Sequence, residues 1–150
     1  MAYNNKDNTS HNIVEEAMVA YNTIDDLNTL QLINALKKGI RYSLFKSLLE
    51  KIPFSLSEWS AFLHLSERTM QRYKKEKKSF DPISSERIVA ISMLYNYGKE
   101  VFGSSNDFNT WLQTKNIAMG GIIPKDLLDS SFGISLIKDE LTRIEHGVLA

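Results

Sequence analysis

The segment from Ser55 to Lys78, which reads SLSEWSAFLHLSERTMQRYKKEKK, constrains the fold of this chain most. Ser55 and Glu58 have the spacing of a capping box, which predicts a helix that starts here and places apolar side chains, beginning with Trp59, on one face. Ser66 predicts a second helix start only a few residues after the first helix ends. The segment is therefore expected to form two short helices joined by a tight turn.

The second of these helices carries most of the charge. Met70 and Tyr73 are expected to point inward, whereas the outer face is polar, and residues 66–78 contain six basic side chains against two acidic ones. This anatomy is typical of a helix-turn-helix, whose second helix lies in the major groove of DNA. The alternative is a solvated basic face without a partner. The residues expected to contact DNA are Arg68, Thr69, Gln71, Arg72, Lys74, Lys75, Lys77 and Lys78.

Outside this segment, apolar residues recur at helical spacing and no alternating strand pattern is found, so the chain is predicted to be all-α. We expect residues 1–25 to form a flexible arm. An apolar pattern over Ile13–Tyr21 there is either a short flanking helix or a contact for a partner. Residues 26–102 are expected to form the helix-turn-helix domain, and residues 103–150 a small helical domain packed on it.

The individual helices follow from spacing and from helix-ending residues. Helices are expected over residues 26–38 and over residues 43–51, and the second should pack on the apolar side of the first, which consists of Leu27, Leu30, Ile33 and Leu36. A long helix should cover residues 84–102. Shorter helical segments are expected around Phe108–Leu112, from Pro124 to Leu128, and from about residues 130–133 to the end.

Composition excludes several classes of protein. The 150 residues carry no net charge and no cysteine, which excludes disulfide and thiolate-metal frameworks and agrees with a cytoplasmic location. The three histidines, His11, His64 and His146, are scattered, and neither a nucleophile motif nor a phosphate-binding glycine loop is found. We therefore expect no catalytic residues, no metal and no cofactor. No apolar run approaches the roughly 20 residues that span a bilayer, and the polar N-terminus does not read as an export signal.

Several motifs, in a fixed order, resemble one known family. The strings FNTWL, GGIIPKDLLDSSFGISLI and LTRIEHGVLA, between Phe108 and Ala150, are similar to the toxin-binding domain of the Xre/MbcA/ParS antitoxins. Upstream, SERTMQRY, SSERI and EVFGS resemble motifs of the same family. The sequence departs from the pattern at His64, where the family commonly has glycine in the turn, and at Tyr73, which replaces an arginine.

The resemblance implies an antitoxin that neutralises a RES-domain toxin, an enzyme that consumes NAD or transfers ADP-ribose. It also implies that the helix-turn-helix binds and represses the operon's promoter, and a single helix-turn-helix reads so few base pairs that a homodimer is expected. In the family, the C-terminal segment lies in the toxin's active-site cleft. Carried over to this chain, that segment is Arg143, Ile144, Glu145, His146, Gly147, Val148, Leu149 and Ala150.

The residues themselves leave alternatives open. The apolar stripe from Ile134 to Val148 is expected to be core, because a helix must bury such a stripe somewhere, whereas the apolar end from Val148 to Ala150 has little reason to be apolar unless a partner covers it. One alternative is a stand-alone transcriptional regulator whose C-terminal domain only dimerises. Another is an adaptor whose helix-turn-helix no longer binds DNA.

Overall fold

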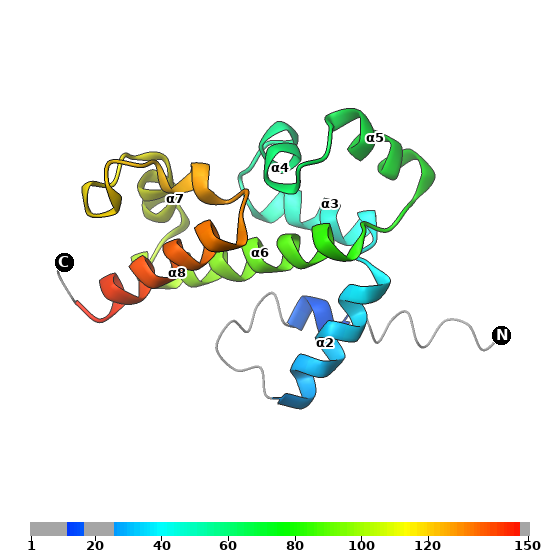
Figure 1. The fold of residues 1–150 in the computed structure, drawn as a ribbon, viewed down its shortest axis with the longest axis horizontal. Helices are drawn as coiled ribbons and strands as arrows, with labels where there is room; N and C mark the ends of the chain where they lie inside the picture. Colours follow the sequence, from blue (N-terminus) through cyan, green and yellow to red (C-terminus); the bar gives the residue numbers. More distant parts are fainter. Residues whose placement is uncertain (1–11, 17–25, 148–150) are drawn as a thin grey trace. The chain divides into compact units, whose positions relative to one another are not determined.

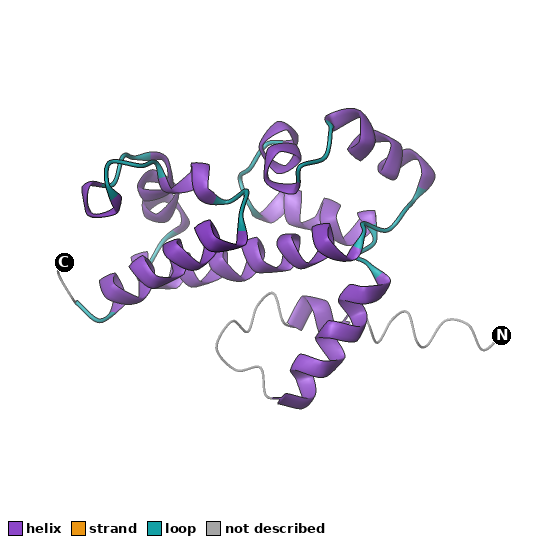
Figure 2. Ribbon diagram, viewed as in Figure 1, coloured by secondary structure: helices purple, strands orange, loops and turns teal. Residues whose placement is uncertain are grey.

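The computed structural model describes residues 12–16 and 26–147, and its regular structure in these ranges is helical (Figures 1 and 2). No strand occurs in the described ranges, where only two single bridges form, Arg41 with Ser79 and Asn116 with Ile122. The all-α prediction is confirmed. The helices are α2 (Asp26–Lys38), α3 (Tyr42–Lys51), α4 (Leu56–Leu63), α5 (Glu67–Glu76), α6 (Pro82–Phe102), α7 (Ser105–Gln113) and α8 (Ser131–Glu145), with 3-10 turns η1 (Ile117–Met119) and η2 (Pro124–Leu127).

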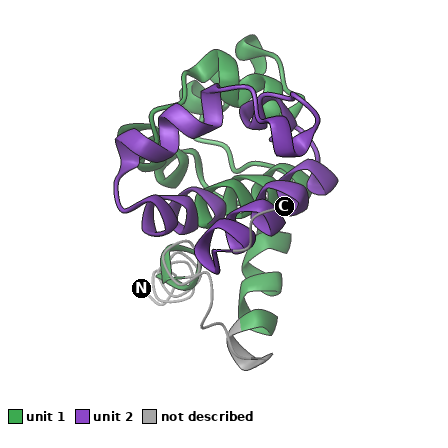
Figure 3. Cartoon of the chain, turned by 90° about the vertical axis from the view of Figure 1, so that its left-hand side faces the viewer, with its two compact units in different colours: residues 1–93 green, residues 94–150 purple. Residues whose placement is uncertain are grey.

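The chain divides into two compact units, residues 1–93 and 94–150 (Figure 3). Helix α6 supplies its first part to one unit and its last part to the other. Of the expected N-terminal arm, only residues 12–16 are described; they are helical, and Val14 is buried. The domain boundary that we predicted after residue 102 stays a prediction. Among the described helices, none is long and apolar enough to cross a membrane.

An aromatic cluster forms the core of the first unit. The ring of Phe45, on α3, packs edge-on against Trp59 of α4, with centroids 5.3 Å apart. The same ring packs against Phe80, which follows α5, at 5.1 Å. Phe80 in turn contacts Tyr73 of α5 at 5.4 Å. The cluster therefore connects α3 and α4 with α5 and with the segment that follows α5.

Short-range signals in the sequence explain where the helices of this unit begin. The Ser55 backbone N–H donates to Glu58 Oε1 at 3.1 Å, and the Glu58 N–H donates to Ser55 Oγ at 3.0 Å, so the predicted capping box is confirmed. Helix α6 begins at Pro82, two residues before its expected start, because Asp81 Oδ1 accepts the Ser84 N–H at 2.7 Å and proline suits the first helical position.

The prediction that the residue 43–51 helix packs on the apolar side of the residue 26–38 helix is wrong for Leu30 and Ile33. Helix α2 has the expected bounds, but Leu30 is 60% exposed and Ile33 is also exposed. The buried aromatic side chains of α3, Tyr42 and Phe45, pack into the aromatic cluster. Helical spacing identified an apolar side on α2 but not which surface covers it.

Two glycines permit close packing in the second unit. A Cβ atom built at Gly98 of α6 would lie 2.2 Å from the Phe108 ring of α7, so the far end of this ring lies directly against the helix backbone. A Cβ at Gly133 of α8 would lie 2.0 Å from the Leu127 carbonyl oxygen of η2. Behind these contacts, Ile137 and Leu141 are fully buried. Glycine is therefore required at both positions, because any side chain would clash with the Phe108 ring or with the Leu127 backbone.

We predict that Gly133→Ala destabilises the protein by about 1 to 3 kcal/mol, the usual cost of overpacking. Elsewhere in a helix, replacing glycine by alanine stabilises by about 1 kcal/mol, so the expected sign is reversed here. Urea unfolding followed by circular dichroism measures the difference. Ser135→Ala, at an exposed position of the same helix, is the control and should change stability little. A Gly133→Ala protein as stable as the wild type would contradict the close contact with η2.

Candidate binding surfaces

The turn between α4 and α5 is closed by backbone hydrogen bonds. The N–H of His64 donates to the Ala61 carbonyl at 3.3 Å, and the N–H of Leu65 donates to the Ser60 carbonyl at 3.1 Å, a pair that defines a Schellman motif. His64 has φ 54° and ψ 33°, in the left-handed region that glycine usually occupies. The helix-turn-helix turn is thus formed with a histidine at positive φ, at the position where glycine is common in the family that the motifs resemble.

The start of α5 is fixed by Ser66. Its Oγ accepts the N–H of Thr69 at 3.0 Å and donates to Thr69 Oγ1 at 2.8 Å. Thr69, one of the residues expected to contact DNA, is half-buried, and its hydroxyl takes part in this cap. Met70, next in sequence, is fully buried, as expected. The hydrogen bonds of the Ser66 cap and the burial of Met70 hold the first turn of α5 in place.

The outer face of α5 brings most of the expected DNA-contacting side chains together. Arg68, Gln71, Arg72 and Lys75 are all exposed, and their spacings of three and four residues place them on one side of the helix. The guanidinium of Arg72 lies over the ring of Tyr73, 5.8 Å from its centroid. Such a contact restricts the arginine side chain without removing its charge. The result is a polar surface that combines hydrogen-bond donors for base edges with positive charge.

The remaining lysines extend this basic surface past the end of α5. Lys74 is exposed on the flank of the helix, and Lys77 ends it at φ 53°. Lys78 Nζ lies 3.1 Å from the Glu76 carboxylate in an ion pair at the surface. A surface ion pair of this kind contributes little to stability and leaves the lysine accessible. Seven of the eight predicted DNA-contacting residues are therefore exposed, and the exception is Thr69.

The C-terminal segment is described only as far as Gly147. Ile144 and Glu145 belong to the last turn of α8, His146 ends the helix, and Gly147 has φ 67°. Arg143 Nη1 donates to Glu140 Oε2 at 2.8 Å. The remaining residues expected to contact the toxin, Val148, Leu149 and Ala150, lie outside the described residues.

A hydrogen-bond cluster holds the last turn of α8. The Tyr97 hydroxyl of α6 donates to Glu145 Oε2 at 2.5 Å and lies 3.2 Å from Thr142 Oγ1. Burial raises the pKa of Tyr97, and the hydrogen bond to the Glu145 carboxylate raises it further. Tyr97 thereby fixes the helix end from which the C-terminal segment departs.

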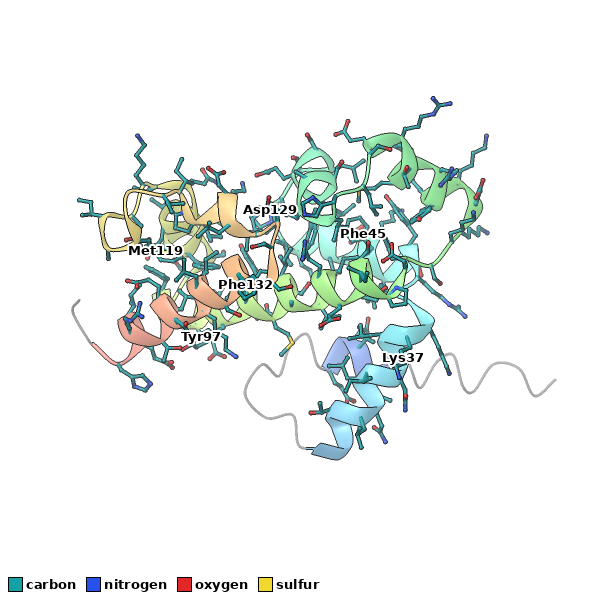
Figure 4. All side chains as sticks on the ribbon, in the orientation of Figure 1. Lys37, Phe45, Tyr97, Met119, Asp129 and Phe132 are labelled. Carbon is teal, nitrogen blue, oxygen red and sulfur yellow. The ribbon has the colours of Figure 1, made fainter. Side chains whose placement is uncertain are left out.

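Two side chains of the second unit were missed by the sequence analysis, Tyr97 and Phe132, both labelled in Figure 4. Tyr97 bonds to a residue 48 positions away, and no local pattern points to such a pair. Phe132 is an exposed aromatic residue in the first turn of α8. Its signal was present in the sequence, because it lies off the apolar stripe through Ile137 and Leu141. No group of three or more metal-ligating side chains occurs within the described ranges.

Two family models match the chain in the same order as these surfaces. The model described as the antitoxin Xre-like helix-turn-helix domain matches residues 31–92. The model described as the antitoxin Xre/MbcA/ParS C-terminal toxin-binding domain matches residues 98–147. Together the two matches cover more than half of the chain and contain both α5 and α8.

Full-length relatives agree with the family models. A protein named Prs ADP-ribosylating antitoxin, from Sphingobium sp. (strain YBL2), is 22% identical over 140 residues, which cover 87% of this chain and 88% of the relative. A protein named Antitoxin Xre, from Yersinia enterocolitica serotype O:8, is 24% identical over 120 residues, covering 79% of this chain and 81% of the relative. The chain belongs to the Xre/MbcA/ParS family of antitoxins, as the sequence motifs indicated.

The Tyr97 cluster predicts a pH-dependent loss of stability. Tyr97→Phe should lower the free energy of unfolding at neutral pH by about 1 kcal/mol, the net value of a typical hydrogen bond. Because the pKa of Tyr97 is higher in the folded than in the unfolded state, its contribution is complete below pH 10 and is lost as the pH rises through the folded-state pKa. Urea unfolding at pH 8 and pH 11 should therefore show a smaller difference between the two proteins at pH 11. A difference that does not change with pH would contradict the assignment.

Proposed function

We propose that this chain is the antitoxin of a type II toxin-antitoxin system that neutralises a RES-domain toxin and represses its own operon. The supporting observation is that one chain joins a helix-turn-helix with an exposed basic α5 to a domain of the toxin-binding type. Residues 26–102 would form the DNA-binding domain and residues 103–150 the toxin-binding domain, with residues 1–25 as an arm that contains a short helix. Both activities are expected in the cytoplasm.

The chemistry of the α5 surface supports promoter binding. Arg68 and Arg72 can each present two donors to a guanine edge, and Gln71 can pair with adenine. The lysines around them suit phosphates, which provide affinity and salt dependence but little sequence preference. Because one helix-turn-helix reads only a few base pairs, we propose that the chain binds a two-fold symmetric operator as a homodimer.

The end of α8 supports toxin inhibition. Tyr97 holds the last turn of this helix, and Gly147 has the backbone angle of a bend. A short apolar segment that leaves from this point could lie in an enzyme cleft and exclude the substrate without any chemistry of its own. The name of the Sphingobium relative, Prs ADP-ribosylating antitoxin, supports a toxin whose substrate is NAD.

We predict that Arg68→Ala and Arg72→Ala each weaken binding to the chain's own promoter by about 1 to 3 kcal/mol, because each removes a contact to a base edge. Lys74→Ala should weaken binding to all sequences similarly and should lower the slope of log affinity against log salt by about one. Fluorescence anisotropy with the DNA upstream of the gene measures both effects. Lys138→Ala, an exposed cation on α8, is the control. If binding survives both arginine changes at physiological salt, α5 is not the reading helix.

We predict that removal of residues 146–150 abolishes neutralisation of the toxin while folding and promoter binding remain. Replacement of Val148–Ala150 by three serines keeps the chain length and removes only the apolar character, so it should also weaken inhibition. Toxin-dependent NAD consumption measures neutralisation, and thermal unfolding reports on the fold. Full neutralisation by the truncated chain would show that the tail does not occlude the active site. A chain that binds its promoter but never binds a toxin would favour the stand-alone regulator.

A further inference from the structure

The first half of α8 exposes large apolar side chains. Phe132 is 92% exposed, and Leu136, one turn later, is 42% exposed. Their spacing of four residues places them on the same side of the helix, and we call this pair the α8 stripe. An aromatic residue exposed to this degree in the first turn of a helix contributes little to the core of its own domain.

The α8 stripe is separate from the side of the helix that packs within the unit. Gly133, Ile137 and Leu141 form the buried side, and η2 lies so close to Gly133 that a single added carbon would clash with the Leu127 carbonyl. The core contacts of α8 are therefore complete without Phe132 and Leu136. The Phe132 side chain is therefore free to contact a partner, and Leu136 leaves 42% of its surface exposed beside it.

The same side of α8 continues toward the C-terminal segment. Arg143 lies seven residues after Leu136, which is almost two full turns, and so it faces the same way. It is exposed, and Gly147 follows one turn later at the bend. The α8 stripe and the start of the C-terminal segment thus form one surface along a single rigid helix.

We infer that the α8 stripe is a docking surface for the toxin, with Phe132 as its apolar anchor and Leu136 as a neighbouring contact. The inference rests on the proposed function and adds a second contact to the C-terminal segment. The toxin is the favoured occupant because the stripe lies in the part of the chain that matches a toxin-binding domain, residues 98–147. A single aromatic anchor of this kind commonly provides a large share of the binding energy of an interface.

Charge also favours this occupant. Asp139 lies on the side of the stripe, and Asp129 stands just before the first turn of α8. A cleft that binds the phosphates of NAD needs cations at its mouth, so the net acidic charge of residues 94–150 as a whole complements it and speeds association, even though Arg143 balances Asp139 on the stripe side itself. Residues 94–150 carry seven acidic side chains (Glu100, Asp107, Asp126, Asp129, Asp139, Glu140 and Glu145) against five basic ones (Lys99, Lys115, Lys125, Lys138 and Arg143).

The test uses the whole chain and a RES-domain toxin, the class of partner that the proposed function names. Phe132→Ser should weaken toxin binding about 30-fold in titration calorimetry, and Leu136→Ser should weaken it less. Phe132→Ser should keep the thermal stability and promoter affinity of the wild type, because this side chain is 92% exposed, whereas Leu136→Ser should keep promoter affinity but lose some stability, because more than half of Leu136 is covered. Ile83→Ser is the matched control, since Ile83 is also an exposed apolar residue, 77% exposed, but lies outside the toxin-binding domain. It should bind the toxin as the wild type does.

The outcomes separate this inference from the proposed function. If the wild type binds and inhibits the toxin but Phe132→Ser does so equally well, the docking surface is wrong and the proposed function stands. If the wild type does not bind the toxin, both are wrong. If Phe132→Ser instead shifts the chain from dimer to monomer in sedimentation, with toxin affinity unchanged, the occupant is a second copy of the chain and the inference is overturned.

Discussion

The orientation of α5 depends on one aromatic contact, the packing of Phe45 between Trp59 and Phe80. Trp59 belongs to α4, which precedes α5, and Phe80 belongs to the segment that follows it. The Phe80 backbone is also fixed, because its N–H donates to the Ile40 carbonyl at 2.8 Å. Both connections to α5 are thus held by the same core, and the exposed basic side chains of α5 rest on a rigid support.

Much of the fold could be predicted because its signals are local. Capping residues such as Ser55 and Ser66 act within three residues of the helix that they start, so their effect can be read from sequence. The packing of α2 could not be predicted in the same way. An apolar side with Leu30 on it is visible in the sequence, but what covers this side depends on distant parts of the chain or on a partner.

The same difference between local signals and distant contacts applies to the candidate surfaces. Arginines and lysines of α5 could be predicted to be exposed, because an unpaired charge is costly to bury. The role of Tyr97 could not, since Glu145 lies 48 residues away and only the folded chain brings the two side chains together. Phe132 was overlooked because aromatic residues are usually counted toward a core. Its position off the apolar stripe of α8 is visible in the sequence, and the structure adds that Gly133 and Ile137 fill the buried side.

Helix α6 contributes buried side chains to both units. Ile88 and Ile91, in its first half, are buried in one unit, whereas Tyr95 and Tyr97, in its second half, are buried in the other. Local unfolding of this helix would therefore withdraw side chains from both cores at once. Cleavage of the unfolded helix by a cellular protease would therefore inactivate both units at the same time, rather than one unit before the other.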